Sequence, residues 1–281
     1  MKQTKIALGT AQFGLDYGIS NSRGIIPRGE IFEILAEAYN AGVSILDTAN
    51  AYGDSEKTIG QFIKKREKKF NIVSKVFGGT AGEVNRIFDE SLRNLGCNFL
   101  YGYLIHHMRD FTEHPEIWDI LSELKSTGKI KKIGFSLYNP DELENIFKKK
   151  INFDIIQVPY NVFDRRFEPH FVKLKKVGVE IHVRSVFLQG LVFKNPGDLT
   201  GDFSKISGKL KLLAELAKKG NTSISSVCLN FAVANKLIDK VVVGVDSIGN
   251  LREILKAEKD IDYVNNISGE LLNLKEDDEQ I

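Results

Sequence analysis

Short apolar runs alternate with amphipathic segments along almost the whole chain. Runs of apolar residues bounded by turn residues predict β-strands, and apolar residues spaced three or four positions apart predict α-helices. The predicted strands are Ile6–Gly9, Ser44–Asp47, Asn71–Lys75, Tyr101–His106, Lys132–Ser136, Ile155–Val158, Glu180–Val183 and Lys240–Val243. The predicted helices are Glu30–Asn40, Glu56–Lys64, Glu83–Leu95, Pro115–Thr127, Pro140–Lys149, Pro169–Val177, Lys209–Lys218 and Leu251–Glu258, with Val227–Ala234 as one additional helix before the last strand.

Glycine follows five of these helices at the position where a left-handed cap is favoured. Four of the five precede a strand, and after the fifth the additional helix comes first. These glycines are Gly42, Gly96, Gly128, Gly178 and Gly220. Eight strand–helix units in 281 residues predict an α/β protein with a (β/α)8 TIM barrel. We expect one domain over residues 1–281, with residues 262–281 as a partly ordered C-terminal tail. A doubly wound open sheet is the alternative, but no Gly-x-Gly-x-x-Gly motif follows any predicted strand.

The composition is that of an ordinary globular protein, with 42% hydrophobic and 27% charged residues. The net charge of +2 includes no basic domain, so nucleic acid is not an implied partner. Cys97 and Cys228 lie far apart without a C-x-x-C pattern, which favours a reduced protein and gives no support to a zinc site. We find no signal peptide or membrane span and expect a soluble cytoplasmic protein that binds no membrane.

Four polar residues at or just after the ends of predicted strands could form one proton-transfer site. Asp47 ends the second strand, Tyr52 lies in the loop after it, Lys75 ends the third strand and His106 ends the fourth. The carboxyl ends of barrel strands converge on one mouth, where barrel enzymes have their active sites. Any one of these residues could instead be a turn cap, an exposed lysine or a packed histidine. All four in this arrangement favour a catalytic site.

The chemistry of the four side chains is complementary. A tyrosine is a poor proton donor near neutral pH because its reference pKa is about 10. A nearby ammonium, here Lys75, would lower the pKa of Tyr52, and Asp47 would serve as the counter-ion. His106 could hold the oxygen of a substrate. His107 is predicted to lie on the opposite face of the strand and either to serve packing or to support the site residues from behind.

The chain resembles the aldo-keto reductase family over nearly its full length. The matching segments are Leu8–Gly14, Asp47-Thr48-Ala49, Tyr52–Gly60, Lys75, His106, Ile133–Ser136 and Gln157–Asn161. The resemblance implies a (β/α)8 barrel and the reduction of an aldehyde or ketone by NADPH or NADH, with a small-molecule carbonyl compound as substrate. It implies that Tyr52 is the proton donor, that Lys75 and Asp47 tune it, and that His106 orients the substrate.

The resemblance also implies the residues that bind the nicotinamide cofactor. Ser136 and Gln157 match residues that bind the carboxamide of the nicotinamide. The loop after the seventh strand would contribute Arg184, Ser185, Leu188 and Gly190, and the loop after the eighth would contribute Gly244, Ser247, Asn250 and Glu253. No metal ligand is expected.

The chain departs from the family pattern in three ways. Leu137 stands where an asparagine usually follows the serine of the fifth strand, and Asn139 is either a displaced substitute or the N-cap of the next helix, the interpretation that we favour. Arg184 replaces a tyrosine that stacks on the nicotinamide; a guanidinium tolerates the reduced ring better than the oxidised cation, which favours the reductive direction.

The third departure concerns the 2′-phosphate of NADPH. Gly244 and Asn250 stand where NADPH-specific members often have lysine or arginine, and Asp246 adds repulsion. Ser247 and a helix N-terminus remain as phosphate donors, with Arg252 nearby. The preference between NADPH and NADH therefore stays open.

Two other functions compete with carbonyl reduction. The same scaffold could be a regulatory subunit that senses a nicotinamide, or a hydrolase with a metal between Asp47, His106 and His107, which leaves Tyr52 and Lys75 unexplained. The substrate is the least determined feature; family analogy favours a sugar-derived carbonyl compound. We expect a monomer or a weak homo-oligomer.

Overall fold

Eight parallel strands form a closed barrel in the order in which they occur in the chain. The computed structural model describes residues 4–78, 80–258 and 261–275. Each strand pairs with the next, and β8 closes the barrel by pairing with β1. The strands are β1 (Ile6–Gly9), β2 (Ile45–Asp47), β3 (Asn71–Val76), β4 (Leu100–Ile105), β5 (Ile130–Ser136), β6 (Ile155–Pro159), β7 (Glu180–Arg184) and β8 (Lys240–Gly244). The predicted (β/α)8 barrel is confirmed.

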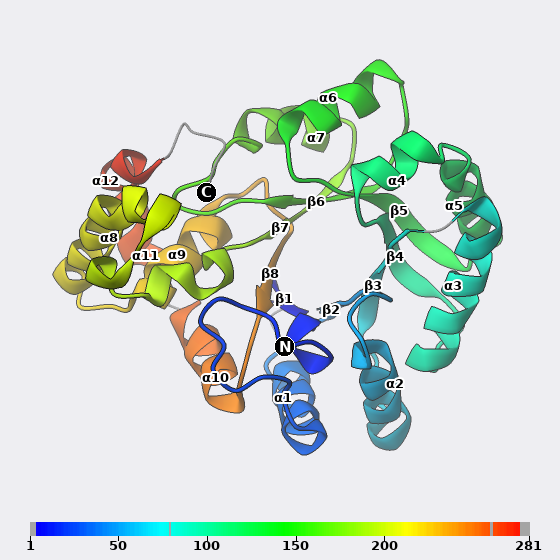
Figure 1. Cartoon of the computed structure of the whole chain (residues 1–281), viewed down its shortest axis with the longest axis horizontal. Helices are drawn as coiled ribbons and strands as arrows, with labels where there is room; N and C mark the ends of the chain where they lie inside the picture. The colour runs from blue at the N-terminus through cyan, green and yellow to red at the C-terminus, as the bar shows by residue number, and fades with distance from the viewer. Residues whose placement is uncertain (1–3, 79, 259–260, 276–281) are drawn as a thin grey trace.

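Helices surround the strands, as the view into the barrel shows (Figure 1). The α-helices are α1 (Arg28–Asn40), α2 (Ser55–Arg66), α3 (Ala81–Leu95), α4 (Met108–Glu113), α5 (Ile117–Ser126), α6 (Pro140–Lys148), α7 (Phe171–Lys176), α8 (Ser207–Lys219), α9 (Ile224–Ala234), α10 (Ile248–Ala257), α11 (Ile261–Asn266) and α12 (Ser268–Leu271). Short 3-10 helices are η1 (Ala11–Phe13), η2 (Glu168–His170), η3 (Leu188–Phe193), η4 (Pro196–Asp198), η5 (Gly201–Ile206) and η6 (Leu272–Leu274).

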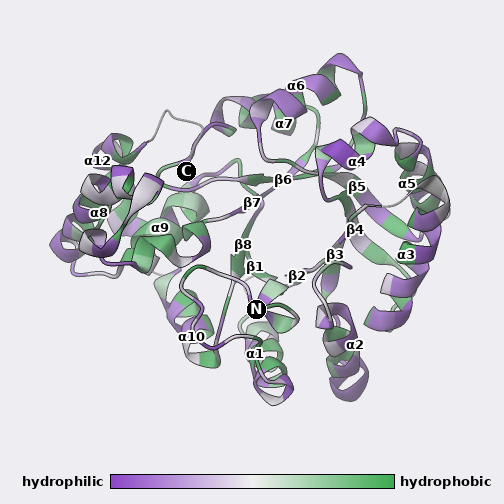
Figure 2. Cartoon of the chain, in the orientation of Figure 1, coloured by the Kyte–Doolittle hydropathy of each residue, from purple (hydrophilic) through white to green (hydrophobic). Residues whose placement is uncertain are grey.

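The strands bury apolar side chains on both faces, as parallel strands covered by helices do. One set fills the interior of the barrel, and a larger set packs between the strands and the helices. Apolar residues therefore follow the strands, whereas polar residues lie on the outer faces of the helices (Figure 2). The interior set consists of Ala7, Ile45, Val73, Leu104, Ile155 and Val242.

The interior side chains form layers along the barrel axis. Because side chains alternate along a strand, β7 presents Glu180, His182 and Arg184 to the same face. At the amino end of the barrel, Glu180 accepts hydrogen bonds from Tyr101 and Lys132 and pairs with His182. The apolar set occupies the middle. Arg184 is thereby placed at the opposite, carboxyl end.

The loops and the C-terminal segment depart most from the sequence predictions. The predicted helix Pro115–Thr127 begins later, as α5, and is preceded by the unpredicted α4. Residues 262–281 were expected to be a partly ordered tail, and the described part of them, 262–275, contributes to α11, α12 and η6. Within them Val264, Ile267 and Leu271 are buried, and α11 packs on α9. The acidic stretch at 276–280 lies outside the described residues.

The prediction of a left-handed cap at Gly220 is wrong. The φ of Gly220 is −83°, and the next residue, Asn221, takes the left-handed conformation with φ 49°. A side chain at Gly220 would collide with the ring of Tyr263 from α11. Glycine is thus required there by tertiary packing and not by the backbone conformation of the cap.

Candidate active site

The four polar residues predicted to act together lie at one mouth of the barrel. Asp47 ends β2, Lys75 is the penultimate residue of β3, and His106 directly follows β4. Tyr52 follows β2 in a loop that is fixed by hydrogen bonds from Thr48 N and Asn50 N to backbone oxygens of β3. The barrel register brings these strand ends together.

Asp47 and Lys75 form a buried ion pair behind this site. Lys75 Nζ lies 2.6 Å from Asp47 Oδ1 and 3.0 Å from the carbonyl oxygen of Thr48. Gln157 Nε2 donates to Asp47 Oδ2 at 2.6 Å, so that both carboxylate oxygens are bonded. Burial acts to lower the pKa of Lys75, but the charge of Asp47 and the proximity of Tyr52 outweigh it and raise that pKa. The ammonium therefore keeps its proton.

Tyr52 faces this ammonium, with Lys75 Nζ 5.4 Å from the centroid of its ring. Burial raises the pKa of Tyr52 by more than the charge of Lys75 lowers it, and the Asp47 charge adds to the increase. The expectation that Lys75 lowers this pKa below its ordinary value is therefore wrong as a net result: Lys75 only limits the increase. The phenol is uncharged near neutral pH and holds a proton that it can donate.

His106 completes the group as a neutral imidazole. Burial, followed by the charge of Lys75, lowers the pKa of His106 to about 3. Its ring meets the edge of the Tyr52 ring at 5.9 Å between centroids, and its buried Nδ1 has no hydrogen-bond partner among the described residues. His107 stacks on His106 at 4.8 Å between ring centroids. The two rings therefore lie side by side and not on opposite faces as predicted, and the contact is one of packing.

A cavity of about 240 Å³ connects this group to the loops after β7 and β8. Asp47, Tyr52 and His106 line one part of it, whereas Lys75 lies beneath the surface. Seven of the ten residues expected to bind a cofactor line the same cavity, namely Ser136, Gln157, Arg184, Ser185, Gly190, Gly244 and Asn250.

Comparison with known proteins identifies one protein family that matches nearly the whole chain. The aldo/keto reductase family model matches residues 5–268. This chain belongs to the aldo/keto reductase family. It is an oxidoreductase that uses NADPH or NADH, as the family does.

Individual relatives are distant. The chain is 24% identical to the uncharacterized oxidoreductase YqkF of Bacillus subtilis (strain 168), with 82% of each chain covered. It is 27% identical to the NADH-specific methylglyoxal reductase of Escherichia coli (strain K12), over 71% of this chain and 68% of that protein. The holo form of aldo-keto reductase AKR11C1 from Bacillus halodurans superposes with a TM-score of 0.75 at 22% identity, covering 94% and 91% of the two chains. This structural similarity shows the fold.

The loop after β7 of this aldo/keto reductase is strained and tied to the loop after β1. Ser185, Leu188 and Gln189 all have positive φ angles, which are uncommon outside glycine. Ile19 N donates to Gln189 O at 2.8 Å, and a side chain at Gly190 would collide with Ser20. The two loops thus meet over the mouth, where each lines the cavity.

Three expected cofactor residues do not line the cavity. Leu188 is part of the strained loop, and Ser247 caps α10 by accepting from Asn250 N while its hydroxyl donates to Asp246. Glu253 is exposed on α10 and accepts a hydrogen bond from Ser225 at 2.6 Å. Their cofactor roles stay predictions.

Asn139 is the N-cap of α6, as favoured from the sequence. It forms a capping box with Glu142, and its Oδ1 accepts from Arg166. Asn139 does not line the cavity. Arg184, rather than Asn139, reaches toward the position of the missing asparagine, because it donates to the carbonyl oxygen of Leu137 at 3.1 Å.

Sequence reasoning gave no role to three further cavity residues: Gln12, Tyr17 and Tyr138. Gln12 Oε1 is buried without a partner among the described residues, and a Cβ at Gly244 would lie 2.8 Å from it. Gly244 therefore makes room for the Gln12 amide. The aromatic pair Tyr17 and Tyr138 carried no sequence signal, because loop tyrosines are common on protein surfaces.

In the part of the chain that the structure describes, no helix is long and apolar enough to cross a membrane.

Proposed function

We propose that this aldo/keto reductase reduces an aldehyde or ketone with Tyr52 as the proton donor, Lys75 and Asp47 as the pair that supports it, and His106 as the group that orients the carbonyl oxygen. The observation that carries this proposal is the buried ammonium of Lys75 next to a cavity-lining phenol. A phenol alone would resist losing its proton. A fixed positive charge beside it stabilises the phenolate that forms during donation.

Each of the other residues then has a specific task. Asp47 holds Lys75 in place and keeps it charged, and Gln157 fixes the second carboxylate oxygen. A neutral His106 can donate one hydrogen bond to the substrate oxygen without competing as an acid. This arrangement works in the reductive direction, since the free enzyme holds Tyr52 protonated.

The residues lining the cavity fit a nicotinamide cofactor. When bound, the reduced nicotinamide supplies the hydride to the carbonyl carbon. Ser136 and Gln157 would hold the carboxamide of the nicotinamide. The amide nitrogen of Gln157 donates to Asp47, which leaves the amide oxygen of Gln157 as an acceptor. The unpartnered oxygen of Gln12 is a further acceptor on the cavity wall.

We also infer that NADH is accepted at least as well as NADPH. Asp246 lines the cavity at the loop after β8. Arg252, the nearby cation considered from the sequence, is paired with Glu37 at 2.8 Å. Arg23 donates to the Asp246 carbonyl oxygen but is paired with Glu30. A 2′-phosphate would therefore meet a carboxylate and two engaged guanidinium groups.

The substrate is proposed to be a polar carbonyl compound, such as a sugar-derived ketone or aldehyde. The described C-terminal segment packs on α8 and α9, and its Leu271 carbonyl oxygen accepts a hydrogen bond from Arg165 in the loop after β6 (Figure 1). Polar side chains line the cavity, among them Gln12, Tyr138 and Arg184, and they suit a hydroxylated substrate. The similar protein of Escherichia coli is named a methylglyoxal reductase, and methylglyoxal is a small oxygenated carbonyl compound.

The test is a comparison of Tyr52→Phe with Tyr39→Phe, which makes the same change on α1 outside the cavity. NADH and NADPH binding is measured by fluorescence titration, and reduction of methylglyoxal is followed by loss of absorbance of the nucleotide. We expect Tyr52→Phe to bind nucleotide normally and to lose turnover by at least about a hundredfold, as for removal of a general acid. Full activity in Tyr52→Phe would refute the proposed role, and absence of nucleotide binding by the wild type would refute the function.

A further inference from the structure

Arg184 places a guanidinium in the cavity, near the proposed proton donor. It ends β7 on the interior face and lines the cavity together with Tyr52 and His106. Its guanidinium lies 4.2 Å above the ring of Tyr138, which belongs to the loop after β5. Nη1 donates to Ser185 Oγ at 3.2 Å and Nη2 to the Leu137 carbonyl oxygen at 3.1 Å. The side chain is thus held across the mouth by neutral partners.

This guanidinium has no carboxylate partner among the residues that the structure describes. The other cation at this end, Lys75, is neutralised by its ion pair with Asp47. Asp246, the second acid on the cavity wall, belongs to the loop after β8 and is bonded by Ser247. Among the described residues, Arg184 is therefore the one cation that lines the cavity, and no carboxylate is bonded to it.

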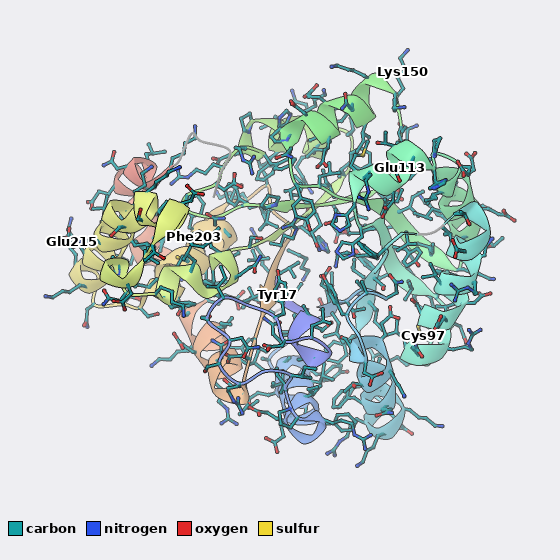
Figure 3. The ribbon with its side chains drawn as sticks, viewed as in Figure 1. Tyr17, Cys97, Glu113, Lys150, Phe203 and Glu215 are labelled. Carbon is teal, nitrogen blue, oxygen red and sulfur yellow. The ribbon has the colours of Figure 1, made fainter. Side chains whose placement is uncertain are left out.

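The positive charge of Arg184 influences the pKa values of the proposed catalytic residues. It acts to lower the pKa of Tyr52 and of His106, although burial is the larger influence on both. It acts in the same direction on Tyr17, which lines the same cavity. Figure 3 shows Tyr17 near the centre of the view into the barrel, whereas Cys97 and Glu113 lie at the periphery. Arg184 and the hydroxyl groups of Tyr17 and Tyr138 thus belong to one cavity with the proton donor.

We propose that Arg184 binds an anionic group, a carboxylate or a phosphate, on the carbonyl substrate. The inference rests on the proposed carbonyl reduction and names the substrate class within it: an aldehyde or ketone with a negative charge a few bonds from the carbonyl carbon. A guanidinium presents several N–H donors in a plane and matches both anions. The ring of Tyr138 and the hydrogen bonds to Ser185 and Leu137 hold the guanidinium in place. The hydroxyl groups of Tyr17 and Tyr138 add donors for a hydroxylated substrate.

Matched pairs of substrates test this specificity. The pairs are 4-oxobutanoate against butanal for the carboxylate, and glyceraldehyde 3-phosphate against glyceraldehyde for the phosphate. For each pair the ratio of kcat/KM, charged over neutral, is measured at saturating NADH. We expect a ratio of at least about ten in the wild type for one pair or both, because a hydrogen bond to a charged group in a partly buried site has this effect. The pair with the larger ratio identifies the anion.

Three variants assign the preference to Arg184. Arg184→Gln should reduce the ratio about tenfold to a hundredfold, toward one. Arg184→Lys should keep part of it, because the charge remains while the planar fork is lost. Arg86→Gln, on α3 and outside the cavity, should leave it unchanged. An unchanged ratio in Arg184→Gln, with only nucleotide binding weakened in the fluorescence titration, would show that Arg184 holds the cofactor and would overturn the proposal.

A binding measurement separates this proposal from the proposed function. Thermal unfolding is followed with benzoate and with its neutral analogue benzamide, which require no turnover. Benzoate should raise the Tm of the wild type more than benzamide does, and the difference should disappear in Arg184→Gln. Equal effects of the two compounds on the wild type would overturn the anion site even if aldehydes are reduced. A selective effect of benzoate in a protein that reduces no aldehyde would leave the anion site standing and refute the proposed function instead.

Discussion

Lys75 Nζ lies 2.6 Å from Asp47 Oδ1 in an ion pair whose side chains are only 1% and 5% exposed. The two residues come from adjacent strands, and their pair joins the interior of the barrel to the proposed proton donor. A buried ion pair contributes little net stability when complete, but removal of one partner leaves an uncompensated charge.

Lys75→Met should therefore destabilise the protein by about 3–5 kcal/mol at pH 7, measured by urea unfolding. Among the described residues, the carboxylate of Asp47 would then keep its hydrogen bond from Gln157 and no counter-ion. The double variant Lys75→Met/Asp47→Asn should recover much of the loss, because it removes the orphaned charge. A single variant as stable as the wild type would show that the pair is not buried in solution.

The pH dependence of reduction should be flat across the neutral range. Donation requires protonated Tyr52, so the rate falls only as pH rises through its pKa, which lies above the ordinary value of 10.0. His106 stays neutral above its pKa of about 3. We expect kcat/KM for the carbonyl compound to change less than about twofold between pH 5 and 9, since kcat/KM reports groups of the free enzyme. A decline with a midpoint near pH 7 would show that Lys75 dominates the titration of Tyr52.

Gln12→Leu should weaken nucleotide binding without destabilising the protein. The buried Oε1 of Gln12 has no partner among the described residues, and an unsatisfied acceptor costs about 1–3 kcal/mol. Its replacement should leave the free energy of unfolding in urea unchanged or higher. The nucleotide Kd, measured by fluorescence titration, should rise about fivefold or more if a ligand satisfies this oxygen. Lower stability with an unchanged Kd would assign Gln12 to the fold alone.

The positions of the strands could be predicted from the sequence, whereas the conformation of the loops could not. Strand positions such as those of β1 and β6 follow from short apolar runs, since a parallel strand must bury both faces. The loop after β7 carries no such pattern. The positive φ angle at Gln189 is held by hydrogen bonds to its carbonyl oxygen from Ile19 N and Ser20 N, more than 160 residues earlier in the chain. No local property of the sequence reports such a contact.

The same distinction applies to charge. The sequence shows that Tyr52 and Lys75 are close to the ends of neighbouring strands, and a nearby ammonium lowers a phenol pKa. Which influence is larger depends on how deeply the phenol is buried, and burial is a property of the packed barrel. Here burial is the larger influence and raises the pKa of Tyr52.

The sequence by itself determined the barrel, its order of strands and helices, and the resemblance that placed Asp47, Tyr52, Lys75 and His106 in one site. It could do so because strand alternation and strand ends are local features, repeated along the chain. Only the tertiary structure decided that Gly220 accommodates Tyr263, and that Arg184 crosses the mouth to Tyr138 without a carboxylate partner among the described residues. These relationships are contacts between side chains that lie far apart in the sequence, and only the packing of the folded chain brings them together.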